Sequence, residues 1–125
     1  MERLFIAGTR ETPEVHLDAE KQIFSISGKS IPEDAFAFFH PVHNWINEYI
    51  TCPNQITELD VKMVYFNTAS SKQLIKIFLS LEKINLLNKD AVVNWHYPHD
   101  EPSMMATGKR YSELMNVKFK FVETV

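Results

Sequence analysis

The sequence predicts a two-layer α/β fold in which helices cover one face of a mixed β-sheet. Strand-like alternation dominates the first third, and later strands are separated by segments with helical spacing, in the order β-β-β-α-β-α-β-α-β. Strands separated by helices pair in parallel through right-handed crossovers. Alternate strand positions are polar, and a sheet buried on both faces would not tolerate such rows. The expected water-facing positions are Ser25, Ser27, Asp60, Lys62, Asn94, His96, Lys118 and Lys120.

Length and composition indicate a single domain, residues 1–125, with its own core. The 125 residues are 45% hydrophobic and 23% charged, which is typical of a globular chain. A net charge of −3 argues against nonspecific nucleic-acid binding. No apolar stretch is long enough for a signal peptide or a membrane span, so we expect a cytoplasmic protein without a membrane partner. The single cysteine, Cys52, excludes an intramolecular disulfide, and the three glycines cannot build a Gly-rich nucleotide loop.

The first third predicts three short strands and the start of a helix. The strands are expected at 4–6, 15–17 and 23–27, with a hairpin loop at 18–22. Ser30 and Glu33 have the S-x-x-E spacing of a capping box, which predicts a helix start there. Apolar residues then recur at helical spacing from Ala35 to Tyr49. Pro41 lies inside this pattern and is expected to bend or interrupt the helix.

The remaining elements follow from the same periodicities. Residues 55–66 form a long expected strand, with Met63 and Tyr65 on one face and Val64 and Phe66 on the other. A helix is expected to begin at the polar cluster 67–71, and its apolar stripe runs to residue 84. A turn at 88–90, a strand at 91–97, a helix at about 101–115 and a strand at 117–121 complete the chain.

The polar cluster Asn67-Thr68-Ala69-Ser70-Ser71 is the first candidate for a functional site. A strand-to-helix junction favours negative charge because backbone N–H groups and the helix dipole point toward it. A phosphate on Thr68 would add roughly −1.5 to −2 charge and three acceptor oxygens there. The residues alone also fit a plain helix cap, with Asn67 or Thr68 as the capping residue.

The histidines are the second candidate. His40 and His43 are three residues apart, as are His96 and His99, and imidazoles at that spacing can share a metal on one helical turn. Pro41 and Pro98 disturb both pairs, so surface or capping histidines are the preferred interpretation.

Cys52 falls at a helix exit, where the dipole disfavours a reactive thiolate.

The segment Val64-Tyr65-Phe66-Asn67-Thr68-Ala69-Ser70-Ser71-Lys72 resembles the Tyr-x-Asn-Thr-Ser-Ser segment of the SiaC family of regulatory phosphoproteins. The likeness runs the full length of the chain. Its other parts are Gly8-Thr9 with Thr12-Pro13, the segment 26–33, Pro41 with Trp45, Asn94-Trp95-His96-Tyr97, and Gly108 with Tyr111-Ser112. Because these segments occur in the same order and at the same spacing as in the family, their combination is specific for it.

This resemblance implies a fold like that of the anti-sigma-factor antagonists, the STAS type. It places the family's phosphorylated threonine on Thr68. It also implies a protein kinase of the histidine-kinase-like ATPase fold and a PP2C-type phosphatase as partners. In the best-understood branch of the family, the unmodified protein binds and activates a diguanylate cyclase, which links it to c-di-GMP signalling.

We therefore expect a non-enzymatic switch protein without cofactor or metal, whose unmodified form docks on a signalling partner. The residues expected around the acceptor and at the partner interface are Asn67, Ser70, Ser71 and Lys72. Two alternatives stay open. A constitutive STAS-like scaffold is kept open by Ala69, which stands where the family usually has Ser, and a metal-binding enzyme would use the histidines.

Overall fold

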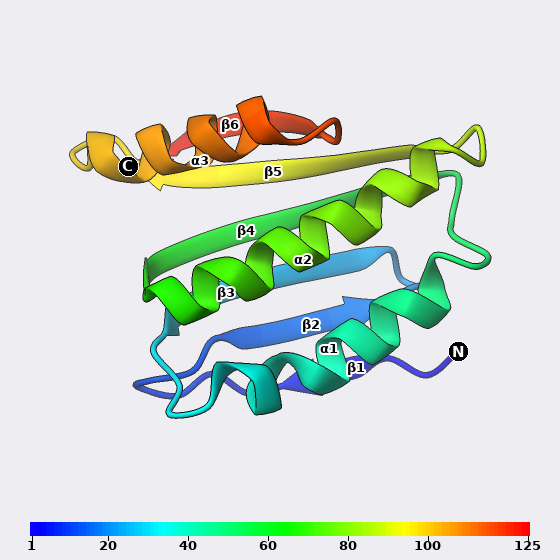
Figure 1. Cartoon of the computed structure of the whole chain (residues 1–125), viewed down its shortest axis with the longest axis horizontal. Coiled ribbons are helices and arrows are strands. Elements are labelled where there is room, and N and C mark those ends of the chain that lie inside the picture. The colour runs from blue at the N-terminus through cyan, green and yellow to red at the C-terminus, as the bar shows by residue number, and fades with distance from the viewer.

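The computed structural model describes all residues, 1–125, and shows one six-stranded sheet covered on one face by three helices (Figure 1). The strands lie in sequence order; β1, β2 and β3 pair antiparallel, and β3 to β6 pair in parallel. The predicted two-layer fold with a mixed sheet is confirmed. The elements are β1 (Leu4–Ile6), β2 (Glu14–Asp18), β3 (Ile23–Ser30), α1 (Ala35–Tyr49), β4 (Ile56–Phe66), α2 (Thr68–Asn85), β5 (Asp90–Pro98), α3 (Pro102–Leu114) and β6 (Lys118–Thr124).

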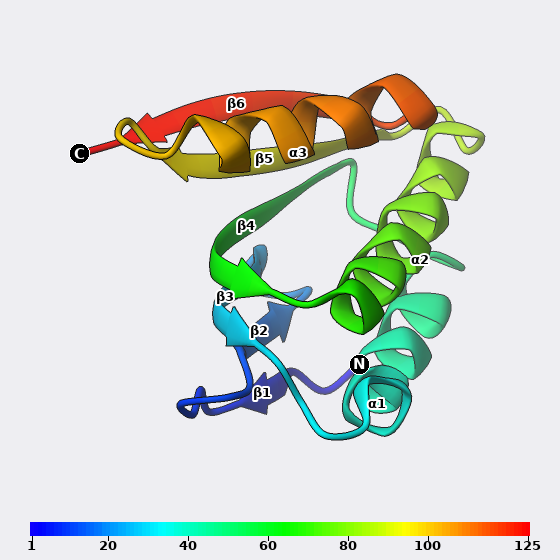
Figure 2. The same cartoon turned by 60° about the vertical axis from the view of Figure 1, so that its left-hand side comes forward.

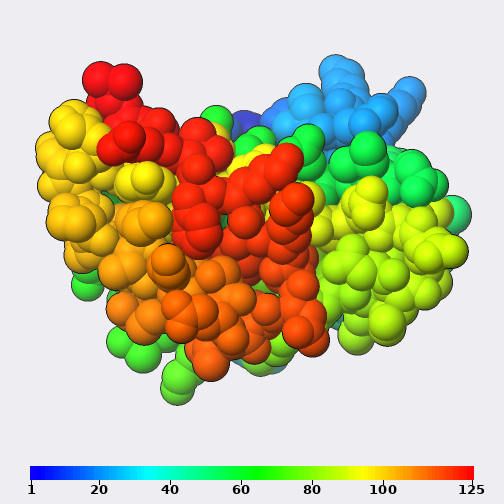
Figure 3. Space-filling model, turned by 90° about the horizontal axis from the view of Figure 1, so that it is seen from above, coloured from blue at the N-terminus to red at the C-terminus, as the bar shows by residue number.

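The core lies between the sheet and the helices. Helices α1 and α2 pack against each other and lie on the same side of the sheet (Figure 2). Trp95, Phe39 and Phe78 are the largest side chains that are fully buried there. Helix α3 packs over β5 and β6, and Figure 3 shows α3 and β6 side by side along this edge of the molecule. None of the three helices combines the length and apolarity that a membrane crossing requires.

The opposite face of the sheet carries the polar residues that the sequence placed there. Asp60 is their centre: its Oδ1 lies 3.0 Å from Nε2 of His96 and accepts a hydrogen bond from Nδ2 of Asn94 at 3.2 Å. Lys62, Lys118 and Lys120 are exposed. The water-facing layer is therefore a polar network rather than a second core.

The predicted capping box at Ser30 and Glu33 is wrong. Ser30 is the last residue of β3, and α1 begins after Asp34, whose Oδ1 accepts a hydrogen bond from the N–H of Ala37 at 3.0 Å. The chain stays extended through Ser30 because that residue pairs with Phe66 of β4. This strand pairing outweighs the local capping pattern.

Pro41 was expected to bend or interrupt the first helix. It lies inside α1, which continues through it, so the expected interruption is wrong. The proline side chain is exposed, while Phe39 and Val42 beside it are fully buried. A proline removes one backbone hydrogen bond from a helix interior. Packing of the apolar stripe on either side holds the helix together despite that loss.

The predicted facing of the last residues of β4 is also wrong, because a bulge changes the register there. Gly28 pairs with Met63, but the next residue of β3, Lys29, pairs with Tyr65, so β4 contains one extra residue. Gly28 has a φ of 106°, which favours glycine. An extra residue reverses the alternation of side chains. Phe66 therefore packs on the core, edge-on to Trp95 with ring centroids 6.1 Å apart, and Tyr65 is 54% exposed.

Candidate functional site

The junction between β4 and α2 is fixed by hydrogen bonds from one residue, Asn67. Its side-chain Oδ1 accepts from the N–H of Ser70 at 2.9 Å, which confirms Asn67 as the N-cap. Its carbonyl accepts from the N–H of Ser71 at 2.9 Å, and its own N–H donates to the carbonyl of Ser30 at 3.1 Å. The start of α2 is thus tied directly to the end of β3.

Ser70 strengthens the same connection from inside the protein. Its side chain is 0% exposed, and its Oγ donates to the carbonyl of Ser30 at 3.0 Å. The Oγ atoms of Ser30 and Ser70 lie 2.7 Å apart, so the Ser30 hydroxyl donates this second bond. In this conformation Ser70 is buried and positions the start of the helix, so its predicted contact with a partner stays a prediction.

Thr68 is the first residue of α2, and it is exposed. The N–H groups of Thr68 and Ala69 precede the first intrahelical bond, which Ser71 donates, so they point out of the helix end. The first turn of α2 contains no acidic residue, and Lys72 is exposed in the next turn. The end of the helix is therefore favourable for negative charge.

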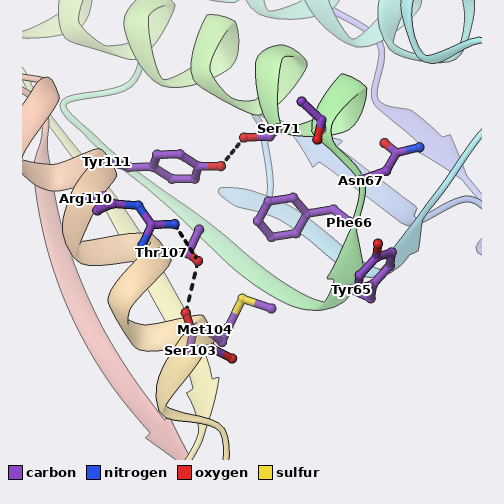
Figure 4. Close-up of a pocket in the computed structure, with 10 residues that line it drawn as sticks. Tyr65, Phe66, Asn67, Ser71, Ser103, Met104, Thr107, Arg110 and Tyr111 are labelled. Atoms are coloured by element: carbon purple, nitrogen blue, oxygen red, sulfur yellow. Dashed lines mark hydrogen bonds between the residues drawn. The ribbon is translucent and has the colours of Figure 1, made fainter.

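A hollow of about 320 Å³ opens between the start of α2 and one side of α3, from Ser103 to Tyr111 (Figure 4). We call it the α2–α3 hollow. Ser71 is half-buried beside it, and its hydroxyl hydrogen-bonds to the hydroxyl of Tyr111, which links α2 to α3. Nη2 of Arg110 donates to Oγ1 of Thr107 at 3.3 Å. The hollow is lined by Tyr65, Phe66, Asn67, Thr68, Ser71, Ser103, Met104, Thr107, Arg110 and Tyr111.

A second hollow, of about 840 Å³, lies between the starts of α1 and α2. We call it the α1–α2 hollow. It is lined by Glu33, Asp34, Ala35, Phe36, Thr68, Ala69, Lys72 and Gln73. Thr68 is the one residue common to both hollows, and so it lies on the ridge that divides them. Of the predicted site residues, Asn67 and Ser71 face the α2–α3 hollow, and Lys72 faces the α1–α2 hollow.

Sequence reasoning missed the contribution of α3 to this site. Ser103, Thr107 and Arg110 follow one another at helical spacing on one side of α3. That polar stripe was the available signal. It did not point to residue 68, because no local pattern says which helix will lie next to which.

Two of the four predicted metal-binding histidines, His43 and His96, hydrogen-bond to other side chains. Nε2 of His43 lies 2.7 Å from Oε1 of Gln73, which ties α1 to α2. Burial lowers the pKa of His43, the hydrogen bond to Gln73 opposes this shift, and the nearby charges of Lys76 and His40 lower the pKa further. His96 bonds to Asp60 on the open sheet face. No three His, Cys, Asp or Glu side chains are grouped to hold a metal ion, so the predicted alternative of a histidine-based metal site has no geometry to support it.

Fold and site together define a small α/β domain with an exposed hydroxyl where its central strand enters a helix. The model of the SiaC family of regulatory phosphoproteins matches residues 6–124. The chain belongs to the SiaC family of regulatory phosphoproteins, as its resemblance suggested. An uncharacterized protein of Pseudomonas aeruginosa strain UCBPP-PA14 is 27% identical over 113 residues, which is 90% of each chain.

Solved structures of one relative share this fold throughout. SiaC of Pseudomonas aeruginosa is 26% identical, with a TM-score of 0.88 over 99% of this chain and 100% of that chain. A second similar structure is that of the diguanylate cyclase SiaD in complex with its activator SiaC, from the same organism. Its matching chain is 26% identical, with a TM-score of 0.89 over 97% of this chain and 99% of that chain.

Proposed function

We propose that this protein activates a diguanylate cyclase and that phosphorylation of Thr68 switches the activation off. The unmodified protein docks on the cyclase through the surface around the start of α2. A kinase of the histidine-kinase-like ATPase fold transfers phosphate to Thr68, and a PP2C-type phosphatase removes it. The switch operates in the cytoplasm. The partner follows from the relative that is an activator of SiaD.

The observation that carries the proposal is the contrast between Thr68 and its neighbours. The backbone N–H of Asn67 and the hydroxyl of Ser70 donate to the carbonyl of Ser30 in β3, whereas the side chain of Thr68 is exposed on the ridge between two hollows. A kinase can reach this hydroxyl without unfolding the helix. The rigid frame around Thr68 holds the acceptor at a fixed position on the docking surface.

The proposed modification is the transfer of one phosphoryl group from ATP to the hydroxyl of Thr68. The Thr68 oxygen attacks the γ-phosphorus of ATP, a new O–P bond forms, ADP leaves, and the hydroxyl proton goes to a base in the kinase. The product adds roughly −1.5 to −2 charge beside the positive end of α2, so it does not destabilise the helix. A partner surface that fits the neutral hydroxyl then meets a bulky dianion.

A switch of this kind needs only modest coupling. A change of about 1.4 kcal/mol alters affinity tenfold, and losing one or two charge-assisted contacts supplies that amount. We assign partner contact to Thr68, Ser71 and Lys72, which border the two hollows, and assign the positioning of the acceptor to Asn67 and Ser70.

The test is a reconstituted assay of c-di-GMP synthesis with the cyclase and kinase from the same genome. Unmodified protein should raise the rate of synthesis, and kinase treatment should remove at least nine-tenths of that increase. Thr68→Ala should gain no phosphate and keep its activating effect after kinase treatment. Thr51→Ala, which removes another exposed threonine beyond the far end of α1, should behave as wild type.

Ala69 favours a second candidate, a constitutive scaffold that is never switched. This position is exposed beside the acceptor and supplies no second hydroxyl. A scaffold predicts equal activation by the unmodified protein and by protein carrying authentic phosphothreonine at position 68. That result would refute the switch, as would full incorporation of phosphate into Thr68→Ala.

A further inference from the structure

Arg110 has no charged partner within the folded protein. No Lys or Arg side chain lies within 4.0 Å of a carboxylate oxygen, and the one contact between a histidine and a carboxylate joins His96 and Asp60 on the opposite face of the sheet. The only hydrogen bond that the Arg110 guanidinium makes to the protein is the one to Thr107, at 3.3 Å, and this is long for a charged donor. The guanidinium therefore keeps its capacity to bind an anion.

The two hollows beside Thr68 differ in charge. The α1–α2 hollow contains Lys72 but also Glu33 and Asp34. The α2–α3 hollow contains Arg110 and no acidic residue. A phosphoryl group on Thr68 would meet two carboxylates and one ammonium group on one side of the ridge, a net charge of −1, and an unpaired guanidinium on the other. Coulomb repulsion and attraction both direct it toward α3.

The α2–α3 hollow is also suited to a phosphoryl group in size and in hydrogen-bonding chemistry. Its volume of about 320 Å³ leaves room for several heavy atoms. The side chains of Ser71, Ser103, Thr107 and Tyr111 place hydroxyl groups around it (Figure 4). The Thr107 hydroxyl donates to the carbonyl of Ser103 at 3.0 Å, and the hydroxyls of Ser71 and Tyr111 bond to each other. The Ser103 hydroxyl and one O–H of the Ser71–Tyr111 pair are therefore left to donate. The planar guanidinium presents paired N–H donors that match two phosphate oxygens.

We propose that Arg110 receives the phosphoryl group of phosphorylated Thr68 in the α2–α3 hollow. This inference rests on the proposed function only in taking Thr68 as the modified residue. On modification, the guanidinium exchanges its bond to Thr107 for charge-assisted bonds to the phosphate. The phosphate and Arg110 then fill the hollow and join α2 to α3, so phosphorylation changes the shape of the docking surface as well as its charge.

The test compares phosphorylated and unmodified protein in three backgrounds: wild type, Arg110→Gln and Lys109→Gln. Phosphothreonine is incorporated at position 68 by chemical ligation or genetic encoding, so that no kinase is needed. Lys109 is the matched control, because it is an exposed cation on the same turn of α3 but does not line the hollow. Both variants change the net charge equally, and neither removes a buried side chain.

Phosphorylation should raise the melting temperature of the wild-type protein by about 3–6 °C. Lys109→Gln should keep that increase, and Arg110→Gln should lose at least half of it. In wild-type protein the NMR signal of the Arg110 side-chain Nε–H should shift on phosphorylation. Equal increases in the two variants, or an unchanged Arg110 signal, would overturn the inference. The NMR measurement tests it even if a variant folds poorly.

These measurements separate the inference from the proposed function. They contain neither kinase nor cyclase, whereas the c-di-GMP assay contains both. If the assay fails and the difference between the variants holds, the proposed switch is wrong and the role of Arg110 is retained. If the assay succeeds and the variants behave alike, Thr68 is the switch and Arg110 does not receive its phosphate.

Discussion

Replacing Gly108 with alanine tests how closely α3 must approach the sheet. A Cβ at this position would lie 2.5 Å from Cδ1 and 2.6 Å from Nε1 of Trp95. Optimal contact between such atoms needs about 3.5–4.0 Å, so α3 and Trp95 would have to separate by roughly 1 Å. Trp95 cannot yield easily, because it is 1% exposed and its Nε1–H donates to the carbonyl of Met104 at 2.9 Å.

Two opposing effects set the size of the loss. Alanine in a helix interior is favoured over glycine by about 1 kcal/mol. Overpacking costs about 1–3 kcal/mol, and weakening the Trp95–Met104 hydrogen bond costs about 1 kcal/mol more. We therefore expect Gly108→Ala to lower the free energy of unfolding by about 1–3 kcal/mol.

The assay is urea denaturation followed by tryptophan fluorescence. With a slope of about 2 kcal/mol/M, the midpoint should fall by roughly 1 M. Ala106→Gly is an informative control, because residue 106 is exposed on the same helix and its replacement changes only helix propensity, by about 1 kcal/mol. A Gly108→Ala protein as stable as wild type, or more stable, would refute the close-packing argument.

Two further predictions concern the helices around the site. Asn67→Ala should lower the free energy of unfolding by about 1 kcal/mol, because the N–H of Ser70 loses its acceptor. Asn67→Asp retains an acceptor oxygen and should keep most of the wild-type stability. Equal urea midpoints for the two variants would contradict the capping role. His43 has a lowered folded-state pKa, so the unfolded chain binds its proton more readily, and stability should fall as pH drops from the ordinary pKa of 6.5 toward the folded value. His43→Gln keeps a polar group near Gln73. Measured by urea denaturation, it should lose less stability than the wild-type protein between pH 7.5 and 5.5. A variant that loses as much stability as wild type over this range would refute the assignment to His43.

Local periodicity predicted most of the fold. The order of elements, the apolar stripes of the helices and the polar face of the sheet all follow from spacings within single segments. The N-cap at Asn67 was also readable, because a cap is a contact between residues three apart in the chain. These features are local, and tertiary packing agrees with them.

The errors occur where pairing between distant segments overrides a local signal. Ser30 fits a capping box but continues a strand because β4 pairs with it. Phe66 was expected on the open face, but the bulge in β4 turns it onto the core. Gly28 is the one local sign of an irregularity there, but it does not show that β4 gains the extra residue.

Patterns within the chain were sufficient to predict the two-layer α/β architecture and the candidate hydroxyl at Thr68. The surroundings of that hydroxyl depend on how distant segments pack. This packing buries Ser70 against Ser30 and brings Tyr111 to Ser71, and each pair is separated by 40 positions in the chain. Contacts over such distances depend on how the crossovers stack the helices on the sheet. Periodicity reports which face of a helix is buried, but not which neighbour that face meets.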